Sequence, residues 1–338
     1  GRNVLHIIVV PKSWGPTYLS AGLDFDISGA SADFDLSLLL DATELNRLGA
    51  DWKTGLRLGT EMTIASRFFQ PLEWEGRFFA GPRAGALQRS INVFDDDGEA
   101  VGEYRVREWN VGLDLGIELG HLLQLGQFSV GIEYGDASGR RLVGDPAFPD
   151  VNVNLGGLVA DLRLDQLDSL WFPTSGWFVD LSYRESLSAL GADIPFHRGE
   201  LLAFGAKTIH RWTGVARVRY GDTFGSDPLF FGFRLGGLFN LSGRPVGQLS
   251  GNTLAFGSLT LRYRLNKTPG TIIKGLYVGA SAEVGNVWQT RNEASASDLL
   301  HAGSVFVVTD TLLGPVYFAY GNSGKKNQAA YLFLNRSF

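Results

Sequence analysis

The residues that could do chemistry in this chain lack the spacing that catalysis requires. No Gly-x-Ser-x-Gly pentad is present, since Gly29-Ala30-Ser31 and Gly279-Ala280-Ser281 both lack its last glycine. An esterase-type nucleophile elbow is therefore not predicted. The five histidines show no metal-ligand spacing, and the chain has neither a dinucleotide-binding GxGxxG nor a phosphate loop. We predict no catalytic residue, no metal site and no cofactor.

Two groups of acidic residues allow a second interpretation. The run Asp95-Asp96-Asp97-Gly98-Glu99 could hold calcium weakly, but a solvated loop explains it better. Aspartates alternate in two neighbouring segments, at positions 24 and 26 and at positions 33 and 35. Paired carboxylates can serve as general acid and base. A polar face shared by two adjacent strands is the interpretation that we favour.

The composition bounds the kinds of protein that this chain can be. Its 338 residues include 23 Phe, 10 Tyr and 8 Trp, with 44% hydrophobic residues, which excludes a disordered chain. The absence of cysteine excludes a disulfide scaffold and a thiolate metal site. A net charge of −5 argues against a nucleic-acid partner. No run of 18 apolar residues is present, so transmembrane helices are not predicted.

Alternation of apolar and polar residues is the dominant pattern, and it predicts strands with one apolar and one polar face. In residues 19–27, Leu, Ala, Leu, Phe and Ile alternate with Ser, Gly, Asp and Asp. Many such segments reach ten residues or more, whereas globular strands average about 5–6 and membrane-spanning strands need about 9–11. Aromatic residues gather at the segment ends, as in the girdles of membrane barrels. These positions are Tyr18, Trp52, Trp109, Trp177, Tyr183, Trp212, Tyr220 and Trp288.

The pattern predicts an all-β fold, a 16-stranded antiparallel transmembrane β-barrel over residues 17–338 with a long sixth extracellular loop. The expected strands are 17–28, 33–42, 50–60, 62–72, 77–90, 103–119, 126–137, 155–165, 176–187, 196–208, 209–221, 252–266, 274–288, 300–310, 312–321 and 327–338. Short connectors such as 43–49 alternate with long ones such as 138–154 and 289–299. This alternation places both chain ends in the periplasm of a Gram-negative bacterium. Residues 1–16 fit the last strand of a separate periplasmic domain, followed by a hinge.

The longest connector, 222–251, carries the most specific signal. It has an apolar stem and a central Leu241-Ser242-Gly243-Arg244, which is unlike a tip built for solvent. Further along, Glu283 shares a face with Ser281 and Gly279, opposite a row of apolar residues. The alternation therefore predicts that Glu283 points into the barrel lumen.

These motifs resemble those of the outer-membrane assembly and secretion superfamily, which includes BamA-type insertases and two-partner secretion transporters. The matching segments are Leu241-Ser242-Gly243-Arg244, Glu283-Val284-Gly285 and the turn 170–177. The resemblance implies that the sixth loop folds into the lumen and that Arg244 pairs with Glu283 on the wall. Here the arginine follows the glycine instead of preceding it, and Glu replaces the family's Asp.

Three N-terminal segments, 14–19, 45–52 and 69–72, resemble more narrowly the barrels of patatin-like proteins secreted by the type Vd route. The resemblance implies a preceding POTRA domain, of which the first residues would be the end, and a lipolytic passenger before it. We therefore expect a translocator that is not itself an enzyme. The expected partners are its own N-terminal passenger, outer-membrane lipid and lipopolysaccharide, the barrel assembly machinery and a possible second copy. An assembly factor for other barrels and a passive porin remain the alternatives.

The seam of the predicted barrel lies where its first strand meets its last. We expect Leu19 and Leu23 to lie there opposite the segment that carries Leu332 and Phe338. Glycine weakens strand pairing, so Gly321 and Gly324 either make this seam the weakest in the barrel or simply shape the preceding turn.

Overall fold

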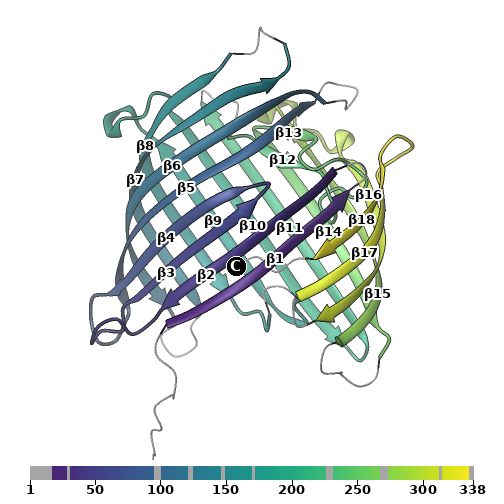
Figure 1. The fold of residues 1–338 in the computed structure, drawn as a ribbon, viewed down its shortest axis with the longest axis horizontal. Helices are drawn as coiled ribbons and strands as arrows, with labels where there is room; N and C mark the ends of the chain where they lie inside the picture. The colour runs from purple at the N-terminus through teal and green to yellow at the C-terminus, as the bar shows by residue number, and fades with distance from the viewer. Residues whose placement is uncertain are drawn as a thin grey trace, which may run out of the picture.

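The computed structural model describes residues 17–28, 31–94, 100–120, 125–145, 149–169, 172–225, 231–266, 273–311 and 314–334. It confirms the predicted fold, because sixteen strands form one antiparallel barrel (Figure 1). The barrel strands are β1 (Thr17–Ser28), β2 (Ser31–Ala42), β3 (Asp51–Gly59), β4 (Met62–Pro71), β5 (Phe78–Phe94), β6 (Ala100–Leu119), β7 (Gly126–Val143), β8 (Val151–Asp165), β9 (Ser175–Ser186), β10 (Phe196–Ile209), β11 (Trp212–Gly225), β14 (Thr253–Arg264), β15 (Ile273–Trp288), β16 (Leu300–Thr311), β17 (Gly314–Asn322) and β18 (Gln328–Leu334).

Closure of the barrel depends on the pairing of its first and last strands. β1 pairs with β2 along its whole length, from Thr17 opposite Ala42 to Ser28 opposite Ser31. Its pairing with β18 covers only the four residues Phe25 to Ser28. Figure 1 shows the purple β1 beside the yellow β18. Within the described ranges, this seam is the shortest strand pairing in the barrel wall.

The outer face of the barrel is apolar and the inner face is polar. On β6, Trp109, Val111, Leu113 and Leu115 are exposed, whereas Asp114 between them is 5% exposed. This arrangement is the reverse of a soluble barrel, and it suits a wall with lipid outside and water or protein inside. No helix in the described ranges is long and apolar enough to cross a membrane.

Strands β5 to β8 extend further than the alternation predicts. The expected loop 138–154 is wrong in its bounds, because β7 continues to Val143 and β8 begins at Val151. The apolar rows end earlier, at Trp109 and Tyr134, but the backbone ladder continues past them through polar residues. In Figure 1 these strands rise above the β3–β4 hairpin, which turns between Gly59 and Met62. Membrane thickness thus sets the length of the apolar row, and backbone hydrogen bonding sets the length of the strand.

Two short strands and three 3-10 turns lie outside the barrel wall. β12 (Phe233–Leu235) and β13 (Leu249–Gly251) pair with each other inside the predicted sixth loop. The turns are Ser188–Leu190, Arg291–Glu293 and Ala296–Asp298. The predicted periplasmic strand and hinge at 1–16, the acidic run at 95–99 and Phe338 lie outside the described residues.

Candidate functional site

The stem of the long loop is an apolar hairpin buried against the wall. β12 and β13 hold the two sides of the loop together in register, with Phe233 opposite Gly251 and Leu235 opposite Leu249. Phe233 and Leu235 pack with Leu254 of β14 in a buried cluster. Burial of these side chains offsets the conformational entropy lost in ordering the loop. The stem therefore fixes where the tip, residues 236–248, can lie.

The tip adopts backbone conformations that are rare outside functional sites. Phe239 and Leu241 have φ angles of 59° and 73° although neither is glycine, and Gly243 has a φ of 101°. Left-handed conformations of non-glycine residues cost free energy and persist only where surrounding contacts enforce them. Here they turn two successive backbone N–H groups, those of Leu241 and Ser242, toward the barrel wall.

Glu283 on β15 receives these N–H groups. Its Oε2 atom accepts hydrogen bonds from the backbone nitrogens of Leu241 (2.8 Å) and Ser242 (2.7 Å). Its Oε1 atom accepts from the hydroxyls of Ser242 (2.7 Å) and Ser281. The residue is 3% exposed. A buried carboxylate is costly unless its oxygens are satisfied, and four donors satisfy this one.

The expected ion pair between Arg244 and Glu283 is wrong. The Arg244 Nε atom donates to the Ser323 hydroxyl (3.2 Å), and Nη1 donates to Gln248 Oε1 (2.9 Å). The physical reason lies in the tip, because its backbone donors and the Ser242 hydroxyl already occupy both oxygens of Glu283. A cation does lie near in the wall: Arg217 of β11 faces inward in the same row, separated from Glu283 by Ser258.

The tip also contacts the last two strands of the barrel. The Gly243 N–H donates to the hydroxyl of Tyr331 on β18 (2.7 Å). A Cβ atom on Gly243 would approach the Asn327 carbonyl oxygen to 2.5 Å, and one on Gly321 would approach the Ser242 Cβ to 2.7 Å. Gly321 pairs regularly with Ala329. The glycine at 321 therefore makes room for the tip, which neither sequence-based explanation foresaw.

The second wall residue predicted from the motif has a steric role. A Cβ atom on Gly285 would lie 2.7 Å from the Ala255 carbonyl oxygen and 2.9 Å from the Phe256 ring. Gly285 thus leaves room for the Phe256 ring in the cluster beneath the stem. Sequence reasoning did not identify Ser304, whose Oγ atom lies 2.7 Å from Ser281 Oγ. The alternation contained a signal for it, because Ser304 lies two strand positions from other inward-facing residues.

A turn from the opposite end of the barrel reaches the same wall. Phe172, in the turn between β8 and β9, is 7% exposed and packs with Tyr277, Phe306 and Tyr331 in a cluster that also contacts the tip residue Phe239. The guanidinium of Arg262 on β14 lies 3.6 Å from the centre of the Phe172 ring and donates to the Pro173 carbonyl. The lumen is therefore filled along this wall from both ends.

Hydrogen bonding holds that turn in place. Partial burial alone would raise the pKa of Asp168, but bonds from the Thr174 hydroxyl, the Thr174 N–H (2.8 Å) and the Ser175 N–H (3.1 Å) outweigh it and keep the pKa below its ordinary value. Charge-assisted bonds of this kind stabilise the ionised carboxylate.

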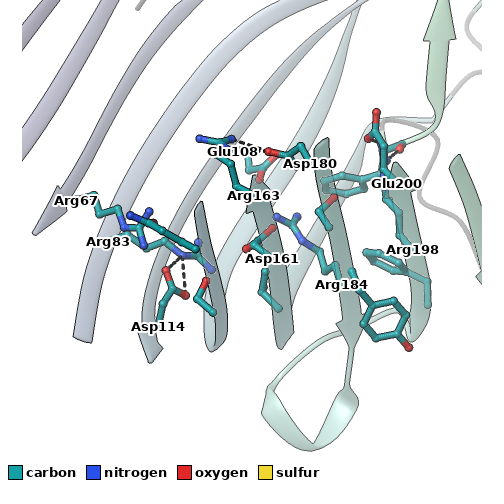
Figure 2. Close-up of a pocket in the computed structure, with 17 residues that line it drawn as sticks. Arg67, Arg83, Glu108, Asp114, Asp161, Arg163, Asp180, Arg184, Arg198 and Glu200 are labelled. Atoms are coloured by element: carbon teal, nitrogen blue, oxygen red, sulfur yellow. Dashed lines mark hydrogen bonds and ion pairs between the residues drawn. The ribbon is translucent and has the colours of Figure 1, made fainter. Parts of the chain in front are cut away.

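The opposite half of the lumen contains a cavity lined by charged residues. A cavity of about 520 Å³ is lined by Arg67, Arg83, Glu108, Asp114, Asp161, Arg163, Asp180, Arg184, Arg198 and Glu200 among others. Figure 2 shows these side chains side by side on successive strands. Arg83 pairs with Asp114 (3.2 Å) and with Glu133 (3.3 Å), and Arg163 pairs with Asp180 (2.8 Å). Arginines and acidic residues both line this wall, and the pairs Arg83–Asp114 and Arg163–Asp180 join neighbouring strands.

The described residues include no metal site of the usual ligands. No group of three histidine or acidic side chains among them is placed to hold a metal ion.

Of the predicted seam residues, Leu332 lies opposite Ile27 of β1. Leu19 and Leu23 pair with Leu40 and Leu36 of β2 and have no described partner on β18.

Comparison with solved structures places this architecture among known barrels. BamA from Haemophilus ducreyi lacking POTRA domains 1–3 matches with a TM-score of 0.73 at 13% identity, over 95% of this chain and 70% of that one. CdiB from Acinetobacter baumannii matches with a TM-score of 0.61 at 13% identity, over 97% and 61%. CdiB from Escherichia coli matches with a TM-score of 0.63 at 12% identity, over 96% and 63%.

At these identities the three likenesses show the fold alone, and the chain spans less than two thirds of each CdiB chain. No curated protein sequence matches the chain significantly. The Omp85 superfamily domain, however, matches residues 46–331, which is most of the chain. Barrels of this kind are translocators or assembly factors rather than enzymes. The chain therefore belongs to the Omp85 superfamily of outer-membrane translocator and assembly barrels.

Proposed function

We propose that this barrel is a secretion translocator whose lumen loop holds the resting channel shut and moves when a passenger is exported. The observation that carries the proposal is the buried attachment of Leu241 and Ser242 to Glu283. A passive porin has no need of a loop fixed by three hydrogen bonds to an acid in the wall. A translocator needs a channel that is closed at rest and can be opened.

The passenger is a patatin-like lipolytic domain that precedes the barrel in the same polypeptide. Support comes from the three segments at 14–19, 45–52 and 69–72, which resemble type Vd barrels. Both ends of the chain then face the periplasm, and the connectors 144–150 and 289–299 face outward. Single cysteines at Asn46 and Asp145 test this orientation in a chain without native thiols. A membrane-impermeant maleimide should label position 145 on intact cells and not position 46, and the reverse result would contradict the orientation.

The test of export uses the complete natural polypeptide in an outer membrane. Intact cells should hydrolyse an added phospholipid, and a Glu283→Gln variant should lower this surface activity while leaving the total activity of lysed cells unchanged. Glu108→Gln provides the control, because it neutralises a lumen acid on the far wall. Equal surface activity of the Glu283 variant and the native protein would contradict the proposed role of the loop. If the natural polypeptide has no hydrolase domain, the proposal of a lipolytic passenger is wrong.

An assembly factor for other barrels is the second candidate, and one observation favours it. Within the described residues, four residue pairs join β1 to β18, and a short seam could open to a substrate strand. The purified chain in lipid vesicles should then accelerate the folding of an unrelated outer-membrane barrel. If it does not, the secretion role is favoured over the assembly role.

A further inference from the structure

The outer surface of β4 to β7 carries a step in the barrel wall. β4 begins at Met62, which lies opposite Gln88 of β5, while β5 continues to Phe94. Beyond Gln88, β5 therefore has no described neighbour strand on that side. In Figure 1 the short β3–β4 hairpin ends below the taller strands beside it, at the end of the barrel that carries the lumen loop. Two grooves lie on the outer surface near this step.

The lower groove, across β3 to β6, is apolar. A groove of about 370 Å³ is lined by outward-facing side chains, which include Leu58, Met62, Ile64, Ala86 and Trp109. Arg107 and Gln88 lie at its upper edge, where the Arg107 Nε atom donates to Gln88 Oε1 (2.8 Å). Trp109 packs edge-on against Tyr134 of β7, with ring centroids 6.0 Å apart. Paired aromatics at the end of an apolar row mark the depth of the membrane interface.

The upper groove is basic and lies across β6, β7 and the start of β8. A second groove, of about 320 Å³, is lined by Arg105, Arg107, Ser138, Arg140, Asp150 and Asn152. Arg107 belongs to both grooves, so the apolar and the basic part are continuous. Arg105 is four residues beyond Trp109, which is about 13 Å along a strand. The three guanidinium groups therefore lie at the level of lipid headgroups.

The charges of this basic groove are poorly compensated. Arg105 and Arg140 are directly opposite each other on β6 and β7, both exposed, and neither forms an ion pair within the described ranges. Like charges directly opposite each other destabilise a strand pair. Asp150 is the acidic residue of the groove, and its Oδ1 atom accepts from the Arg141 N–H (2.9 Å). The folded barrel thus maintains a repulsion that an anion would relieve.

We propose that this surface binds one phosphorylated glycolipid of the lipid A class, with an acyl chain in the apolar groove and a phosphate between Arg105, Arg107 and Arg140. Guanidinium groups bind phosphate oxygens bidentately, and the shared position of Arg107 joins the two parts of one amphipathic ligand. Such binding explains both the step in the wall and the unpaired arginines. It is independent of what the barrel exports.

The test is native mass spectrometry of the whole chain in detergent, titrated with lipid A that carries both phosphates. Replacing both Arg105 and Arg140 by Gln should weaken binding by about a hundredfold or more, because each lost charge-assisted hydrogen bond weakens it by about tenfold or more. Dephosphorylated lipid A should bind the native protein as weakly as the phosphorylated lipid binds the variant. Ile64→Gln should also weaken binding, since it places a polar group in the apolar groove.

Arg211→Gln is the matched control, because Arg211 lies beside the Trp212–Tyr263 pair at the other rim. It should leave binding unchanged. Equal binding by the native protein and the Arg105/Arg140 variant, or by both forms of the lipid, would overturn the proposal. If inorganic phosphate at the same concentration as the lipid displaces it, the groove binds only the phosphate group. That result would also overturn the proposal. The variant should fold, with an unchanged or raised melting temperature in lipid-free detergent, because it removes a like-charge pair; a lowered melting temperature would contradict the argument from repulsion.

Discussion

Ser242 donates both its backbone N–H and its hydroxyl to the Glu283 carboxylate, and each donor–acceptor distance is 2.7 Å. These two hydrogen bonds join the tip of the lumen loop to strand β15. The tip has no charged partner for this acid, because Arg244 bonds to Ser323 and Gln248 instead. The attachment therefore depends on correctly oriented neutral donors in a site that excludes water. Neutral donors are effective there because the surroundings are buried.

Removal of the acid should open the channel. Glu283→Ala leaves two backbone N–H groups and two hydroxyls without their acceptor, and each unsatisfied buried donor costs about 1–3 kcal/mol. We expect larger and more frequent conductance steps in planar bilayers than for the native barrel. Glu108→Gln should leave the conductance near its native value. Identical traces for the native protein and Glu283→Ala would show that the loop does not limit ion flow.

Arg244 should contribute less to the stability of the barrel than Glu283 does. Arg244→Ala removes two hydrogen bonds to neutral partners, so the free energy of unfolding should fall by about 1–2 kcal/mol. Its effect should add to that of Glu283→Ala, and exchanging the two charges should rescue nothing. A loss for Arg244→Ala as large as that for Glu283→Ala, or recovery on charge exchange, would indicate an ion pair in the working protein.

The space at Gly321 should be as important for holding the loop tip in place as the hydrogen bonds to Glu283. A Cβ atom there would overlap the Ser242 side chain at 2.7 Å, so Gly321→Ala should displace the tip. The expected result is raised conductance with a normally folded wall. Gly199→Ala is the control, because a Cβ atom on Gly199 in β10 meets nothing within 4 Å. Native conductance for Gly321→Ala would mean that the tip adapts without leaving its place.

A disulfide across the seam tests whether export needs the wall to open. Ile27 and Leu332 are directly opposite on β1 and β18, so cysteines at both positions should cross-link in a chain without native thiols. If the passenger leaves through the seam, oxidation should stop export and a reductant should restore it. A cross-link between Leu19 and Leu40 on β1 and β2 is the control. Undiminished export by the oxidised seam variant would exclude a lateral route.

Much of the fold and part of the site could be predicted from the sequence. Alternation alone located the sixteen strands and the inward direction of Glu283, because a barrel wall imposes a period of two on every residue. It could not show that β7 continues to Val143, since polar residues outside the membrane no longer alternate in hydrophobicity. Nor could it identify the partners of Glu283. Those donors are backbone groups oriented by left-handed conformations at Phe239 and Leu241, residue types that give no sign of such a turn.

The double-mutant cycle between Ser242 and Glu283 tests the central claim most directly. The free energy of unfolding in urea is measured by tryptophan fluorescence for the native barrel, Ser242→Ala, Glu283→Ala and the double variant in lipid vesicles. Because Ser242 loses a hydroxyl bond to a charged acceptor, we expect a coupling free energy of about 1.5–3 kcal/mol. Effects that add to within about 0.5 kcal/mol would show that the two residues act independently, and the attachment of the loop to the wall would have to be abandoned.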